Sequence, residues 1–86
     1  MQVKGMMDAN ERAEHEKKHN TTLVSGYEAL ADALDNQVSS FKLKMLAKDG
    51  VIGFYHDAFK RRYWFDVKDV ASAIRVHREK QVETKK

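Results

Sequence analysis

The first residues to weigh for chemistry are His15-Glu16-Lys17-Lys18-His19, which have the H-E-x-x-H spacing of a zinc-binding helix. On a helix this spacing puts two imidazoles on one face, beside a glutamate that can act as a general base. Catalytic zinc also needs a third protein ligand and a shaped cleft that excludes bulk water. Residues 1–20 are mostly polar, and a chain of 86 residues has no room for an accompanying domain. We therefore interpret the motif as a chance match and expect no metal site.

The other patterns of enzyme chemistry are missing from the sequence. There is no cysteine, which excludes a disulfide scaffold and a thiolate zinc site. We find no glycine-rich phosphate loop, no activated serine constellation and no paired acids. A chain of this length buries only ~60–65% of its unfolded surface, which leaves little room for a substrate cavity. We expect a protein that is not an enzyme, with no cofactor and no small-molecule substrate.

Charge is the second chemical signal. The formal net charge is only +3, but it is unevenly distributed along the chain. Residues 21–40 carry three acidic residues and no basic ones, whereas residues 41–65 carry six basic residues and two acidic ones. Such asymmetry indicates a polyanionic partner. No apolar run has the ~18–20 residues of a membrane span, and no signal peptide is recognisable, so we expect a cytoplasmic protein with no membrane partner.

The pattern along the chain divides it into three parts. Residues 1–21 favour a helix from Ala9 to His19 but contain few apolar residues, so we expect a flexible or frayed-helix N-terminal arm. Residues 22–78 contain the apolar periodicity of a folded domain. Residues 79–86 form a charged C-terminal tail.

The folded part begins with two predicted helices joined by a tight turn. Ser25 and Glu28 have the spacing of a capping box before the first helix. Residues 35–37 break the helical pattern, and either Ser39 or Ser40 can cap a second helix over residues 40–48, which Gly50 ends in a left-handed conformation. The expected buried stripes are Tyr27, Leu30, Ala31 and Leu34 on the first helix, and Leu43, Leu46 and Ala47 on the second.

After Gly50 the apolar period changes from helical to alternating. Residues 51–56 and 61–65 predict a β-hairpin, and Asp66 is expected to cap a third helix. The expected inward positions are Ile52, Phe54, Tyr63 and Phe65 on the hairpin, and Val67, Val70, Ala71, Ile74 and His77 on the helix. The order is therefore helix, turn, helix, hairpin, helix.

In this order, residues 38–52 (VSSFKLKMLAKDGVI) resemble the recognition helix of excisionase and MerR-like winged helix-turn-helix domains. Residues 28–34 are similar to the first helix of that family, and residues 54–70 to its wing and closing helix. The turn at residues 35–37 and the wing are longer than is usual in the family. The resemblance implies an α+β, mainly α fold: a small winged helix-turn-helix with a hairpin wing, a C-terminal helix and the polar N-terminal arm.

The resemblance also implies a DNA-binding surface. The second helix would enter the major groove, with Ser40 and Lys44 at base edges and Lys42 and Lys48 at phosphates. The basic hairpin would follow an adjacent minor groove. The candidate DNA-binding residues are Ser39, Ser40, Phe41, Lys42, Lys44, Met45, Lys48, Lys60, Arg61 and Arg62.

The implied function is sequence-specific binding of double-stranded DNA by an excisionase-like recombination directionality factor or a small transcription regulator of a phage or mobile element. A recombinase or a second copy of the chain would be the protein partner. The alternative is a winged-helix protein–protein interaction module, with the lysines as a solvated face and Arg61-Arg62 as protection of a strand edge. Phe59 at the hairpin tip has three open uses: a wedge against DNA, a contact with another subunit, or packing on Trp64.

Overall fold

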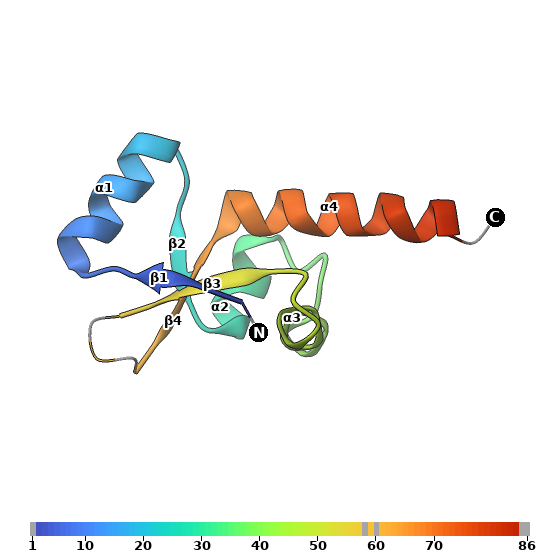
Figure 1. Ribbon diagram of the computed structural model, residues 1–86, viewed down its shortest axis with the longest axis horizontal. Helices are drawn as coiled ribbons and strands as arrows, with labels where there is room; N and C mark the ends of the chain where they lie inside the picture. Colours follow the sequence, from blue (N-terminus) through green and yellow to red (C-terminus); the bar gives the residue numbers. More distant parts are fainter. Residues whose placement is uncertain (1, 58, 60, 85–86) are drawn as a thin grey trace.

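The computed structural model describes residues 2–57, 59 and 61–84, and contains four helices and four strands in this part of the chain (Figure 1). The elements are β1 (Gln2–Met6), α1 (Ala9–His19), β2 (Leu23–Ser25), α2 (Tyr27–Ala33), α3 (Ser40–Lys48), β3 (Gly53–His56), β4 (Tyr63–Asp66) and α4 (Val67–Thr84). The expected α+β class is confirmed. None of the helices in the described ranges is long and apolar enough to cross a lipid bilayer.

A single sheet organises these elements, with the strand order β1-β3-β4-β2. The strands β3 and β4 form the predicted antiparallel hairpin, in which Tyr55 pairs with Trp64. On one side β2 pairs antiparallel with β4, and on the other β1 pairs parallel with β3. The two outer strands therefore come from the N-terminal third of the chain, where the sequence predicted none.

The helix pair forms as its apolar spacing predicts. The connection between α2 and α3 turns through Asp35 and Asn36, both in the left-handed region, with φ of 57° and 56°. Ser39 is the N-cap of α3, and its hydroxyl accepts a hydrogen bond from the Lys42 amide at 3.1 Å. Gly50 follows the helix with φ of 76°, a conformation that a side chain makes costly.

The core lies between the helices and the sheet. Its largest fully buried side chains come from five separate elements or their links, which ties α2, α3, the hairpin and α4 together. These side chains are Leu30, Leu43, Ile52, Phe65 and Val70. The predicted stripes are confirmed at these positions, whereas Ala71 of α4 is exposed.

The N-terminal segment differs most from expectation. Residues 2–20 belong to the folded structure rather than to a flexible arm, because β1 pairs with β3 and Met7 is buried. A capping box forms at the start of α1, where Asp8 accepts from the Glu11 amide and the Glu11 carboxylate accepts from the Asp8 amide. None of the α1 residues is buried, so polar contacts rather than an apolar face hold this helix.

Three smaller expectations are wrong. Ser25 lies in β2 and does not cap α2, whose N-cap is Gly26 without a side-chain bond. Tyr63 is 39% exposed, because it stands at the hairpin end of β4, where its ring contacts Phe54 but one side stays open to solvent. Residues 79–84 are helical rather than a separate tail, since α4 continues to Thr84 and projects beyond the rest of the molecule (Figure 1); residues 85–86 of the predicted tail lie outside the described residues.

Candidate nucleic-acid interface

The outer face of α3 carries most of the candidate residues. Burial of Leu43, Leu46 and Ala47 fixes the rotation of this helix, so the positions between them face solvent. Phe41 is 73% exposed and Met45 is 40% exposed. The other candidates on this helix and at its cap are also exposed: Ser39, Lys42, Lys44 and Lys48. Ser40 is half-buried.

The cations on this face form no ion pair with any residue that the structure describes. The ion pairs among the described residues join Lys4 to Asp69 and His15 to Asp66, both outside α3 and the hairpin. Within the described part of the chain, no carboxylate therefore neutralises the ammonium groups of α3. Such groups remain available for an external anion.

The hairpin between β3 and β4 is organised by one carboxylate. Asp57 Oδ1 accepts hydrogen bonds from the Phe59 amide at 3.1 Å and the Arg61 amide at 2.8 Å. These bonds, chiefly that from Arg61, hold the pKa of Asp57 below its usual value. The carboxylate thus binds backbone amides within the turn and forms no ion pair with the side chain of Arg61 or Arg62.

Three side chains of the hairpin face solvent. Arg61 and Arg62 are exposed, and Phe59 is 78% exposed with the Arg61 guanidinium 5.7 Å from its ring centre. Phe59 does not fold back on Trp64; the Arg12 guanidinium lies over the Trp64 ring instead, at 4.1 Å. Lys60 lies outside the described residues.

The sheet sets the spacing between α3 and the hairpin tip. The strand β3 leads from the end of α3 towards the tip, so the two basic regions lie at opposite ends of this strand (Figure 1). A strand of four residues spans ~13 Å.

The acidic α2 precedes α3, and Glu28 borders a shallow pocket of about 330 Å³ together with Ser39 and Ser40. Sequence reasoning did not place this carboxylate beside the start of α3.

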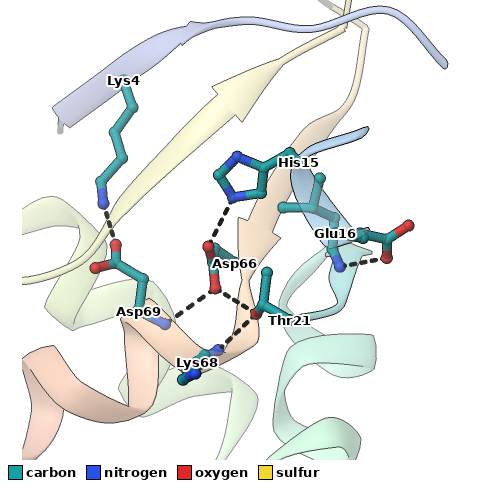
Figure 2. A network of polar contacts seen from close by, with 8 residues as sticks. Lys4, His15, Glu16, Thr21, Asp66, Lys68 and Asp69 are labelled. Atoms are coloured by element: carbon teal, nitrogen blue, oxygen red, sulfur yellow. Dashed lines mark hydrogen bonds and ion pairs between the residues drawn. The ribbon is translucent and has the colours of Figure 1, made fainter. Parts of the chain in front are cut away.

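A second polar cluster was also missed from the sequence. Asp66 accepts hydrogen bonds from Thr21 Oγ1 at 2.6 Å and the Asp69 amide at 3.0 Å, and its other oxygen lies 2.8 Å from His15 Nε2 (Figure 2). Burial acts to raise the pKa of Asp66, but the bonds from Thr21, His15 and Asp69 outweigh it and hold the pKa below its usual value. The cluster borders an open cavity of about 480 Å³.

Two of the H-E-x-x-H residues, His15 and Glu16, make polar contacts in or beside this cluster. His15 contacts Asp66, and the Glu16 carboxylate accepts a hydrogen bond from the Leu23 amide at 2.8 Å. The His15 and His19 rings are 4.5 Å apart, but within the described part of the chain no group of three suitable side chains converges on a metal position. Both contacts fasten α1 to the strands and to α4.

No family model, curated protein or solved structure matches this chain.

Proposed function

We propose that this chain is a winged helix-turn-helix protein that binds double-stranded DNA, with α3 in the major groove and the β3–β4 hairpin as the wing. The order of elements supports this proposal, because α2, a short turn and α3 are followed directly by an antiparallel hairpin. The pairing of β2 with the outer side of β4 anchors the base of that hairpin.

The observation that carries the proposal is the exposed, unpaired positive charge. Lys42, Lys44 and Lys48 on α3 are exposed and form no ion pair with any described residue, and the same holds for Arg61 and Arg62. Phosphate contacts of this kind provide most of the sequence-independent affinity of DNA-binding proteins. The charge is placed on two elements that approach DNA from neighbouring grooves.

Each group has a role in the proposed complex. Ser40 and Lys44 lie in the first turns of α3, where recognition helices contact base edges, and both can donate hydrogen bonds. Lys42 and Lys48 neutralise phosphates and fix the register without reading sequence. Arg61 and Arg62, with Lys60 beside them in sequence, enter the negative potential of an adjacent minor groove.

The proposed setting is recombination or transcription control in a phage or mobile element, as an excisionase-like directionality factor or a small regulator. A binding protein of this kind performs no catalysis. One copy contacts one half-site, so useful affinity needs a second copy or a recombinase bound to the neighbouring DNA.

Salt dependence tests the proposal. Binding of the labelled protein to duplex DNA, followed by fluorescence anisotropy at several salt concentrations, should show a steep loss of affinity as salt rises. The variants Lys44→Glu and Arg61→Glu should bind far more weakly with an unchanged thermal midpoint. Lys17→Glu, on the exposed side of α1, makes the same change of charge and should bind like the wild type.

Two results would contradict the proposal. One is the absence of binding to any duplex, or binding that salt does not weaken, which would favour the protein–protein interaction module. The other is an equal loss of affinity in Lys17→Glu and Lys44→Glu, which would show that only net charge matters.

A further inference from the structure

The middle of the outer face of α3 is apolar. Phe41 and Met45 stand four positions apart and so lie one above the other on the same face, opposite the buried Leu43 and Ala47. Phe41 is 73% exposed, which leaves most of its ring in contact with water in the free protein. The two side chains together form a small exposed apolar patch, a feature that binding surfaces use.

Lysines flank this apolar pair on both sides. The period of 3.6 residues places Lys44 and Lys48 along one side of the pair and Lys42 along the other. The arrangement is suited to a groove with negatively charged walls and an apolar feature on its floor. A flat apolar protein partner would instead leave these lysines facing uncharged surface.

The DNA major groove offers one apolar group on its floor, the C5 methyl of thymine. We propose that Phe41 and Met45 contact thymine methyl groups and give the protein a preference for A·T pairs opposite the middle of α3. This inference rests on the proposed function, since it requires α3 to enter the major groove. Part of the recognition of bases would then come from apolar contacts, which the hydrogen bonds of Ser40 and Lys44 cannot replace.

Removing the methyl group from DNA tests the inference without a known target sequence. We would measure binding to two duplexes of equal length, one of alternating dA and dT and one of alternating dA and dU, by fluorescence anisotropy. Loss of one buried methyl weakens binding about fourfold, so the uracil duplex should bind about four- to fifteenfold more weakly for one or two contacts. The salt dependence should be the same for both duplexes.

The chain provides a matched control for the aromatic residue. Phe41→Ala should reduce the difference between the two duplexes by about fourfold, since the missing ring removes one methyl contact. Met45→Ala should reduce it by a smaller factor. Phe59→Ala removes a phenyl ring of similar exposure from the hairpin tip, so it can change both affinities but should preserve their ratio. Thermal unfolding of all three variants checks that the fold is intact.

The outcomes separate the two proposals. If no duplex binds with a steep salt dependence, the proposed function fails. If both duplexes bind with steep salt dependence and equal affinity, the proposed function survives and the thymine contact is overturned. A preference for thymine that persists in Phe41→Ala and Met45→Ala would also overturn it, because the discrimination would then come from other residues or from DNA shape.

Discussion

The imidazole Nε2 of His15 lies 2.8 Å from a carboxylate oxygen of Asp66, although the two residues are 51 positions apart in the chain. This contact joins α1 to the start of α4, where Asp66 also accepts the Asp69 amide as an N-cap (Figure 2). Asp66 is only 9% exposed, so its hydrogen bonds form largely away from water. The helix without an apolar face is thereby held by a partly buried polar contact.

Substitution of Asp66 should therefore destabilise the protein substantially. Asp66→Ala removes the helix cap and leaves Thr21 and His15 without their acceptor, which should lower the free energy of unfolding by about 1–3 kcal/mol. His15→Ala should cost about 1 kcal/mol. Urea unfolding of both single variants and the double variant gives their coupling, and additive effects would show that the contact contributes nothing to stability.

The lowered pKa of Asp66 predicts a dependence of stability on pH. The folded protein binds this proton less readily than the unfolded chain does, so ionised Asp66 stabilises the fold above the unfolded pKa. That stabilisation is lost as the pH falls below about 4 and through the folded pKa. Thermal midpoints measured between about pH 2 and pH 7 should fall more steeply for the wild type than for Asp66→Asn. Parallel curves would contradict this assignment.

The fluorescence of Trp64, the only tryptophan in the sequence, is sensitive to the position of α1. The Arg12 guanidinium lies 4.1 Å from the centre of the Trp64 ring, so α1 covers part of the indole. Arg12→Ala should shift the fluorescence emission of Trp64 to longer wavelength and cost about 0.5–1 kcal/mol of stability. Lys18→Ala, an exposed position on the same helix, should change neither quantity. An unchanged spectrum in Arg12→Ala would mean that Arg12 does not cover the indole of Trp64.

The sequence predicted the parts of the fold that depend on local signals, and it did not predict the parts that depend on long-range contacts, such as the docking of α1. The order and approximate positions of α2, α3 and the hairpin follow from local apolar spacing and turn residues, which a sequence displays directly, although the cap of α2 is not the predicted Ser25. The strands β1 and β2 have few residues, and their pairing depends on β3 and β4 far along the chain. The docking of α1 depends on polar contacts such as Glu16 with Leu23, which leave no periodic signal.

The sequence likewise predicted only part of the candidate interface. The buried stripe Leu43, Leu46 and Ala47 determined which residues of α3 face solvent, and the structure agrees except at Ser40, which is half-buried. Neither the pocket that brings Glu28 beside Ser40 nor the backbone bonds that close the hairpin on Asp57 could be predicted, because both depend on tertiary geometry.

The N-cap of α3 allows stability and DNA binding to be separated. Ser39→Ala removes the hydroxyl that accepts the Lys42 amide and should cost about 1 kcal/mol of stability. Ser39→Asp keeps an acceptor at this position and should restore most of that stability. Because it adds a negative charge at the proposed interface, Ser39→Asp should nevertheless bind DNA more weakly than Ser39→Ala. Equal affinities of the two variants would place the start of α3 away from the phosphates.

Lys48 provides a quantitative test of the contact with phosphate. It lies in the last turn of α3, exposed and without an ion pair among the described residues, so its substitution removes only an external contact. Lys48→Ala should lower affinity for every duplex sequence by a similar factor and reduce the slope of log affinity against log salt by ~0.9. Lys17→Ala on α1 is the matched control and should leave the slope unchanged. If Lys48→Ala instead weakened binding to only some sequences at constant slope, Lys48 would contact a base edge, and the rotation of α3 in the groove would differ from the one proposed.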